Sequence, residues 1–355
     1  MHRNLKYLLK LFGNILVIYR KLFLISVLIA LANPVSAQPD IVRLLQLHDS
    51  IVQISVELEN GTTGTGTGVV LSPEYVITNC HVIANGKGAN VAKYGDGYKP
   101  LSIKADWKHD LCALKFDGLP FKPVQMRDTD TLNTEEEIFS IGYPNGNNVP
   151  QPSYGTVKAK YPFDGAIIIR SDAAFGLGSS GGALFDQELH LIGITTFKSP
   201  GPNGYFYSLP VEWIKQLLQT QELDSLSTNE TPFWALPYEK QPYFMRVVIP
   251  FQNKEWQTLN TLSREWSSNE PMTADAWYFL GQSEIGLKKL EQAKIDFEKA
   301  LNINPRHLDA LKNLYKLAIQ DKDFTALEKI KTQIGNLDNS LLQELENNTE
   351  PRVNH

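Results

Sequence analysis

The apolar residues between positions 51 and 209 restrict the fold of this chain more than any other feature, because they come in short, separated runs. At residues 51–59 apolar and polar residues alternate, which is typical of a strand with one buried face. Pro, Gly, Asn and Asp separate the later runs. These runs lie at residues 69–71, 75–78, 111–116, 138–141, 166–169, 191–196 and 205–209. Many short strands with turn residues between them predict an all-β barrel or sandwich.

The chain becomes helical and repetitive after this region. Trp277-x2-Leu280-Gly281, then Ala293-x3-Phe297, then Pro305 fit the tetratricopeptide (TPR) pattern, with Glu284 where Tyr is usual. The same interval of 34 residues separates equivalent apolar positions on both sides of this repeat, namely Trp256, Leu290 and Phe324; Leu259, Ala293 and Leu327; and Trp266, Ala300 and Ile334. We therefore expect one good repeat and two degraded flanking ones rather than an ordinary amphipathic helical bundle.

The first 37 residues are typical of an export signal. Residues 1–21 contain five basic residues and no acid, and a mainly apolar run of 11 residues follows at 22–32. Asn33-Pro34 and the small residues 35–37 then resemble a signal-peptidase site, so that Gln38 would begin the mature protein. The alternative is an uncleaved anchor, although a spanning helix needs ~20 apolar residues. We expect a periplasmic or secreted protein that meets the membrane only transiently, through this segment.

Composition sets the domain boundaries and excludes several classes of function. Residues 224–238 are rich in Ser, Thr, Asn and Pro, which indicates a linker. The predicted domains are therefore a signal peptide at 1–37, an all-β domain at 38–223 and helical repeats at 239–345.

A net charge of −5 without a basic patch argues against a nucleic-acid partner. No Cys/His cluster has metal-ligand spacing, and we expect no metal and no other cofactor.

The segment Gly178-Ser179-Ser180-Gly181-Gly182 carries the chemistry. A serine hydroxyl is a poor nucleophile until a base removes its proton, and flanking glycines let the backbone present N–H groups to a developing oxyanion. His81 ends an apolar strand and Asp110 opens another. Taken alone, His81 could be an ordinary surface histidine and Asp110 an ordinary turn residue. Together, in the order His, Asp, Ser, they follow the chain order of chymotrypsin-like enzymes.

Four stretches of the sequence resemble HtrA/Deg-type trypsin-like serine peptidases. They are Gly64–His81, with the histidine at its end, Asp110–Lys115 around the aspartate, Ser171–Leu184 around the serine, and Tyr205–Ile214 before a terminal helix. The likeness covers about residues 45–220 and implies an all-β chymotrypsin-like double barrel, followed here by the all-α TPR domain. By resemblance, Ser180 attacks the substrate, His81 acts as base and then acid, and Asp110 orients the imidazole.

The resemblance also implies the binding residues. The backbone N–H groups of Gly178 and Ser180 would form the oxyanion hole, and Ile194, Thr195, Thr196 and Phe197 would pair with the substrate backbone as an added strand. Ala174 would lie at the floor of the S1 pocket with Phe175 beside it. Since no carboxylate is there, we expect cleavage after small or medium apolar residues rather than after Lys or Arg. Leu177 departs from the family, which usually has Pro at this position.

The two cysteines stand beside the predicted catalytic residues. Cys80 precedes His81, and Cys112 follows Asp110 by two residues. If His81 and Asp110 meet in the fold, the cysteines lie close to each other, and export permits a disulfide. Two buried thiols that act as small hydrophobic residues are the alternative, and the sequence leaves both open.

Two other functions compete with an exported serine endopeptidase. Gly178-x-Ser180-x-Gly182 also fits the nucleophile elbow of α/β-hydrolases, but that fold needs a helix directly after the serine, and its acid and histidine follow the serine. The stronger rival is a silent or latent scaffold that binds proteins. In either case the TPR repeats suggest a protein partner or a recruited polypeptide substrate.

Overall fold

The computed structural model describes residues 41–58, 61–84, 86–201, 204–223 and 230–349. The predicted signal peptide at 1–37 and residues 224–229 of the predicted linker lie outside these residues. The chain divides into compact units at 1–44 and 45–355, and every contact described below lies within the second. Helix α2 (Ile41–Leu47) is the first described element. No helix among the described residues is long and apolar enough to cross a membrane.

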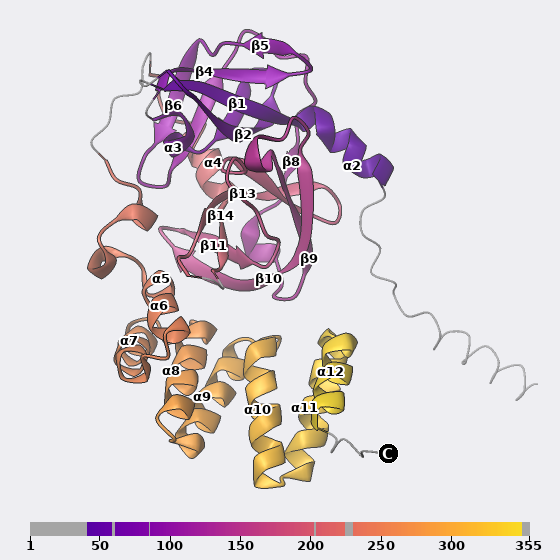
Figure 1. Ribbon diagram of the computed structural model, residues 1–355, viewed down its shortest axis with the longest axis vertical. Coiled ribbons are helices and arrows are strands. Elements are labelled where there is room, and N and C mark those ends of the chain that lie inside the picture. The colour runs from indigo at the N-terminus through magenta and orange to yellow at the C-terminus, as the bar shows by residue number, and fades with distance from the viewer. Residues whose placement is uncertain (1–40, 59–60, 85, 202–203, 224–229, 350–355) are drawn as a thin grey trace, which may run out of the picture. The chain divides into compact units, whose positions relative to one another are not determined.

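The first sheet contains seven strands in the order β5-β4-β1-β2-β3-β7-β6 and forms a half-barrel (Figure 1). Its strands are β1 (Ile51–Leu58), β2 (Thr63–Ser72), β3 (Tyr75–Thr78), β4 (Gly86–Lys93), β5 (Asp96–Tyr98), β6 (Ser102–Asp106) and β7 (Leu111–Lys115). The alternation predicted for β1 places Val52, Ile54 and Val56 in the core of this sheet. Burying each such side chain contributes roughly 1.5–3 kcal/mol, which is why the pattern fixes the register.

The second sheet also contains seven strands, in the order β12-β9-β10-β11-β14-β13-β8. Because β12 also pairs with β13, six of these strands close into a barrel. The strands are β8 (Gln125–Met126), β9 (Glu137–Gly142), β10 (Gln151–Phe163), β11 (Ala166–Ser171), β12 (Gly182–Asp186), β13 (His190–Lys198) and β14 (Phe206–Pro210). Helix α3 (Cys80–Ile83) follows β3, and α4 (Val211–Leu217) follows β14. This architecture confirms the predicted double barrel.

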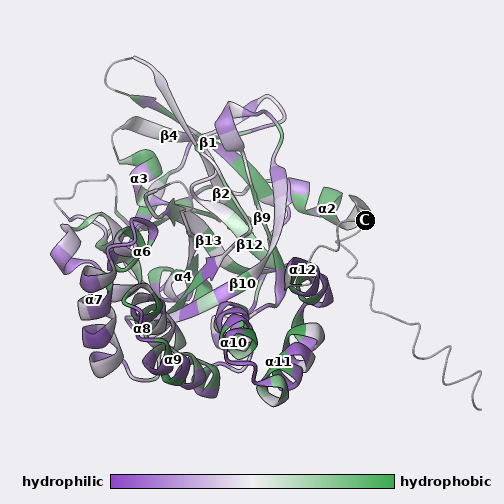
Figure 2. Ribbon diagram, turned by 60° about the horizontal axis from the view of Figure 1, so that its bottom comes forward, coloured by the Kyte–Doolittle hydropathy of each residue, from purple (hydrophilic) through white to green (hydrophobic). Residues whose placement is uncertain are grey.

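The remaining helices succeed one another as neighbours in an all-α region (Figure 1). They are α5 (Tyr243–Arg246), α6 (Val248–Gln252), α7 (Trp256–Asn269), α8 (Ala274–Gly286), α9 (Leu290–Ile303), α10 (Leu308–Asp321), α11 (Phe324–Leu337) and α12 (Asn339–Thr349). Helices α7 to α12 each carry hydrophilic and hydrophobic residues, as expected of amphipathic helices (Figure 2). The all-α part of the predicted fold class is confirmed.

The repeat period is visible in the backbone as well as in the side chains. Helices α7, α9 and α11 begin at the positions that the sequence period marked, and each contains 14 residues. Before each of them a lysine has a positive φ, at Lys254, Lys288 and Lys322, so the same left-handed turn recurs. At Gly281 in α8, a Cβ atom would lie 2.8 Å from the Phe297 ring of α9. The glycine of the pattern is therefore needed for the close approach of the two helices.

Glu284 of α8, which replaces the usual Tyr, is fully buried. Burial, followed by a hydrogen bond with Asp296 of α9, raises the pKa of the Glu284 carboxyl to about 7. Arg264 lies 3.4 Å from the Glu284 carboxylate and opposes this rise. The departure from the repeat pattern therefore places a protonatable carboxyl inside the helical region.

A buried ionic cluster joins the second barrel to the helices. Arg170 of β11 lies 3.2 Å from the Asp275 carboxylate of α8, and His307 lies 2.9 Å from it. The Tyr161 hydroxyl of β10 also donates to Asp275. Burial alone would raise the pKa of Asp275, but Arg170 and then His307 outweigh it and lower that pKa to about 2. The helical region is thus fixed to the barrel by charge pairing as well as by packing.

Candidate active site

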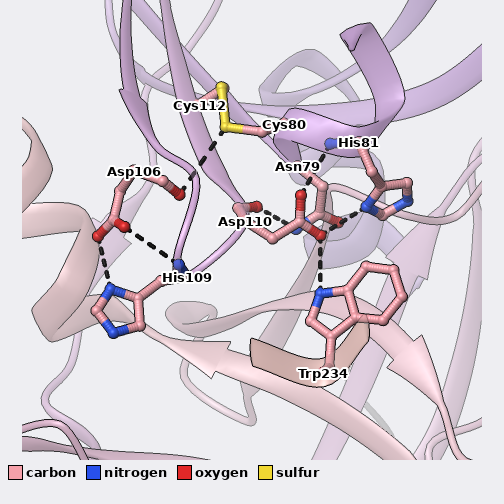
Figure 3. Close-up of a disulfide and its surroundings, with 8 residues drawn as sticks. All are labelled: Asn79, Cys80, His81, Asp106, His109, Asp110, Cys112 and Trp234. Carbon is pink, nitrogen blue, oxygen red and sulfur yellow. Dashed lines mark hydrogen bonds and ion pairs between the residues drawn. A yellow bond between two sulfur atoms is a disulfide. The ribbon is translucent and has the colours of Figure 1, made fainter. Parts of the chain in front are cut away.

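His81 and Asp110 form a hydrogen-bonded pair in the first barrel (Figure 3). The His81 Nδ1 atom lies 2.6 Å from Asp110 Oδ2, and the His81 backbone N–H donates to Oδ1 at 2.8 Å. Helix α3 begins directly after β3 and so carries His81, while Asp110 lies in the turn before β7. Asp110 has a φ of 59°, which Asp tolerates better than most residues, and it is only 1% exposed. These two contacts fix the imidazole against a buried carboxylate.

Asn79 and a disulfide hold the segments that carry this pair. Asn79 Nδ2 donates to the Asp110 carbonyl at 2.9 Å and to Thr196 Oγ1 at 3.0 Å. Cys80 and Cys112 form a disulfide, with their Cα atoms 4.9 Å apart (Figure 3). Of the two states that the sequence leaves open, the structure has the bridged one. The backbones on either side of His81 and Asp110 are therefore joined by a covalent bond.

Ser180 lies in the loop between β11 and β12, which Thr67 of β2 supports from the first barrel. Thr67 Oγ1 donates to the Gly178 carbonyl at 2.8 Å, and the Thr67 N–H donates to the Ser180 carbonyl at 2.9 Å. Gly178 has a φ of 88°, and a Cβ atom there would lie 2.5 Å from the Tyr143 carbonyl oxygen. Glycine is therefore required at this position for both reasons.

The loop leaves two backbone donors free. The Asn145 N–H donates to the Leu177 carbonyl at 2.6 Å, and in a trans peptide the following N–H, that of Gly178, points the opposite way. Within the described parts of the chain, the N–H groups of Gly178 and Ser180 donate to no protein acceptor. These are the two groups that the resemblance assigns to an oxyanion hole.

The Ser180 hydroxyl does not bond His81 in this structure. Its Oγ atom donates to the Thr196 carbonyl at 3.4 Å. The Nε2 atom of His81 points away from Asp110 and has no protein partner among the described residues (Figure 3). A serine hydroxyl reorients by rotation about χ1, and catalytic hydrogen bonds are often formed only when substrate is bound. The structure thus brings two of the three predicted residues into direct contact.

The predicted substrate-pairing strand needs a correction. Ile194 pairs with Ala183 of β12 on one side and Leu209 of β14 on the other, and Thr195 is flanked in the same way. A substrate strand therefore cannot pair with Ile194 or Thr195, because both edges of the backbone are occupied. From Thr196 to Lys198 the β12 side is unpaired; Phe197 and Lys198 pair with β14, and Thr196 lies at a register shift. The open edge includes Thr196 and Phe197 but extends one residue further than predicted, to Lys198.

The predicted S1 residues line a small cavity. Ala174 is exposed, Phe175 is half-buried, and both lie on a cavity of about 220 Å³ together with Gly176 and Ser179. The Phe175 ring lies 5.1 Å from that of Phe206 in β14. Phe206 pairs across the sheet with Lys198, at the end of the open edge. The sequence analysis did not single out Phe206, whose approach to Phe175 depends on the pairing of β13 with β14.

Trp234, from the predicted linker, is a further site residue that sequence reasoning missed. Its indole Nε1 donates to Asp110 Oδ2 at 3.1 Å (Figure 3). Its ring lies edge-on to that of His81, with the centroids 5.5 Å apart. The neighbouring Phe233 is also buried. Two adjacent aromatic residues in a segment otherwise rich in Ser, Thr, Asn and Pro were the signal that could have indicated packing rather than a free linker.

One group among the described residues has donor atoms close enough to hold a metal ion. Asp186, Glu188 and His190 place their ligand atoms within 4.8 Å of one another. Asp186 already contacts the Arg127 guanidinium at 3.2 Å, and His190 lies 3.1 Å from the same carboxylate oxygen. Since arginine already supplies positive charge to this carboxylate, we assign no metal to the group.

Comparisons with known proteins place two families on this chain. Residues 66–194 match the trypsin-like peptidase domain family, and residues 274–307 match the tetratricopeptide repeat family. A protein of Rickettsia prowazekii (strain Madrid E) named "Probable periplasmic serine endoprotease DegP-like" is 31% identical over 175 residues, or 45% of this chain and 34% of that protein. A protein of the same name from Pseudomonas savastanoi pv. phaseolicola (strain 1448A / Race 6) is 30% identical over 161 residues, or 42% of this chain and 33% of that protein.

The chain thus spans about a third of the length of these curated relatives. Among solved structures, "HtrA-type protease AlgW with tripeptide" is similar with a TM-score of 0.46 and 24% identity, over 50% of this chain and 61% of that one.

Proposed function

We propose that this chain, which contains a trypsin-like peptidase domain and a tetratricopeptide repeat, is an exported serine endopeptidase that hydrolyses peptide bonds in polypeptide substrates. One observation carries the proposal. The His81 ring is fixed to the buried Asp110 carboxylate, and its Nε2 atom bonds no other group in the part of the chain that the structure describes. This is the arrangement that a general base for a serine nucleophile requires.

Each residue of the site then has a separate role. Ser180 Oγ attacks the scissile carbonyl as His81 Nε2 takes its proton, and His81 later returns the proton to the leaving amine. Asp110 stabilises the imidazolium and keeps Nδ1 as the protonated nitrogen. The N–H groups of Gly178 and Ser180 stabilise the negative charge on the tetrahedral intermediate. The open edge of β13 at Thr196 holds the substrate backbone by strand addition.

Two features favour small or medium apolar side chains at P1. Ala174 offers no carboxylate for a Lys or Arg side chain. Phe175 lies on the same cavity and is in ring contact with Phe206, so the surroundings of Ala174 are apolar. Profiling with a peptide library should give dominant cleavage after Ala, Val or similar residues. Dominant cleavage after Arg would contradict this part of the proposal.

The location and the partner are proposed on separate grounds. The basic, then apolar, then small-residue pattern of residues 1–37 supports export, and the relatives named periplasmic endoproteases support the periplasm as the destination. The three helical pairs α6–α7, α8–α9 and α10–α11 are enough repeats to present a recognition surface. We assign this surface to the recruitment of a protein partner or of the substrate itself.

A second function is a latent or silent scaffold, which one observation favours: the Ser180 hydroxyl bonds the Thr196 carbonyl and not His81. Labelling with a fluorophosphonate probe, read by intact mass, separates the two functions because the probe reacts only with an activated serine. We expect one adduct on the purified protein and none on the Ser180→Ala variant. Absence of an adduct on the natural protein would favour the scaffold.

A further inference from the structure

The strongest feature outside the roles assigned so far is the contact of Trp234 with Asp110. We propose that Trp234, which lies beyond the peptidase domain in sequence, is a positioning residue of the active site that fixes the Asp110 carboxylate behind His81. The inference rests on the proposed function as a serine peptidase. It makes the segment between the barrels and the repeats part of the catalytic apparatus.

The hydrogen bonds of the Asp110 carboxylate support this role. Among the described residues, its oxygens accept hydrogen bonds from His81, through the backbone and the ring, and from the Trp234 indole. Thr196 and Asn79 lie nearby, but the Thr196 hydroxyl donates to the Ile194 carbonyl and Asn79 bonds the Asp110 carbonyl instead. Trp234 is therefore the one side chain other than His81 that orients this carboxylate in the described structure.

The position of the Trp234–Asp110 hydrogen bond allows it to affect the proton on His81. The indole N–H and the imidazole Nδ1 share one oxygen, Asp110 Oδ2, at 3.1 Å and 2.6 Å. Asp110 is 1% exposed, so water does not replace a lost donor easily. A donor on Oδ2 both limits rotation of the carboxylate and withdraws part of its charge from the imidazole.

Trp234 is itself firmly held, as a positioning residue must be. The Trp234 and Phe197 rings stack with their centroids 5.7 Å apart. The preceding residue, Phe233, is 2% exposed, and its backbone N–H donates to the Lys108 carbonyl at 3.0 Å. On the other side, Gln241 Nε2 donates to the Trp234 carbonyl at 3.1 Å. The indole is thus anchored to the first barrel, to the open substrate strand and to the segment that leads into α5.

The test replaces Trp234 with phenylalanine, which keeps an aromatic ring but lacks the indole N–H. In Trp234→Phe the phenyl ring keeps the stacking with Phe197, but the donor to Asp110 is lost. We expect kcat to fall about tenfold, the worth of one hydrogen bond to a buried charged group, with KM changed by less than about twofold. We also expect the acidic limb of the kcat/KM profile to move up by about half a pH unit. The reason is that Asp110 Oδ2, with one donor fewer, stabilises protonated His81 more strongly.

A matched control is available in the same aromatic cluster. Trp213 donates its indole N–H to the Asp164 carbonyl at 3.2 Å and stacks on His109, and its N–H does not bond Asp110. Trp213→Phe also removes one buried indole donor, so it reproduces any general effect on folding. We expect it to leave kcat and the acidic limb unchanged per labelled active site. Fluorophosphonate titration counts those sites in each variant.

The results of these experiments separate a failure of the proposed function from a failure of the inference about Trp234. No labelling of the natural protein would remove the proposed function, and the inference with it. Labelling of the natural protein together with an unchanged kcat and unchanged acidic limb in Trp234→Phe would overturn the inference alone. A rise in KM at constant kcat would also overturn it, since Trp234 would then only contact substrate. If Trp234→Phe folds poorly, the downfield ¹H NMR signal of the His81–Asp110 proton in its folded fraction decides: an unshifted signal contradicts the role.

Discussion

Two His–Asp pairs in this protein have the same chemistry and opposite surroundings. In the first barrel, His81 Nδ1 lies 2.6 Å from Asp110; at the junction with the helices, His307 Nε2 lies 2.9 Å from Asp275. The His81 side chain is 34% exposed, whereas that of His307 is 4% exposed. Both carboxylates are buried. The two pairs therefore differ in how exposed the histidine is and in which ring nitrogen meets the aspartate.

The difference lies in the second ring nitrogen. His307 Nδ1 accepts a hydrogen bond from the Ala310 N–H at the start of α10, so its Nε2–H donates to Asp275. Both nitrogens are occupied, and Arg170 completes the charge balance. His81 keeps Nε2 unbonded within the described structure. A free nitrogen beside a nucleophile, and not the pair itself, is what makes a candidate base.

The largest expected effect comes from replacing the two histidines in turn. His81→Ala should lower kcat/KM by roughly 10⁴-fold or more, because the serine loses its base, and should leave the thermal midpoint nearly unchanged. His307→Ala should do the reverse, since it removes a helix cap and leaves Asp275 short of a donor. Kinetics and thermal unfolding of both variants make the comparison. Equal losses of activity in the two folded variants would contradict it.

The buried His307–Asp275 pair can also be broken by replacing the aspartate. Asp275→Asn leaves Arg170 buried without a counter-charge and should lower the free energy of unfolding by about 3–5 kcal/mol. Asp128→Asn is the control, because Asp128 pairs with Lys215 at the surface, where such pairs contribute about 0–1 kcal/mol. Urea unfolding of both variants measures the difference. A loss in Asp275→Asn no larger than in the control would show that the cluster does not stabilise the junction.

The pKa of Asp275 gives this pair a defined pH window. The folded-state pKa is about 2, below the value of about 3.9 for an unfolded aspartate. Its contribution to stability is therefore complete above about pH 4 and is lost as the pH falls toward 2. Asp275→Asn should lack this part of the acid dependence. If the stability of Asp275→Asn falls as steeply as that of the natural protein in this pH window, a group other than Asp275 causes the acid dependence.

The last prediction concerns the disulfide beside the exposed His81–Asp110 pair. Cys80 and Cys112 are separated by 32 residues, and closing a loop of this size contributes about 3–4 kcal/mol on the loop-entropy model. Replacing both cysteines with serine should lower stability by up to this amount while some activity remains, because His81 and Asp110 still meet. Urea unfolding and fluorophosphonate labelling measure the two effects. Retained stability with lost labelling would reverse this interpretation.

The sequence by itself determined the features that repeat or alternate locally. The two-residue period of β1 and the interval of 34 residues between Trp256, Leu290 and Phe324 each predict where a side chain points, whatever lies opposite. The Gly-rich segment around Ser180 and the strand frames of His81 and Asp110 are local too. For this reason the double barrel, the helical repeats and the candidates His81, Asp110 and Ser180 could be predicted.

Only the tertiary structure decided which distant segments meet. The occupied edges of Ile194 and Thr195 depend on the pairing of β13 with both β12 and β14. The bond from Trp234 to Asp110 crosses 124 residues, and the pair of Tyr161 with Asp275 crosses 114. Contacts over such distances depend on how whole elements pack and close upon one another, and no local period in the sequence records that packing.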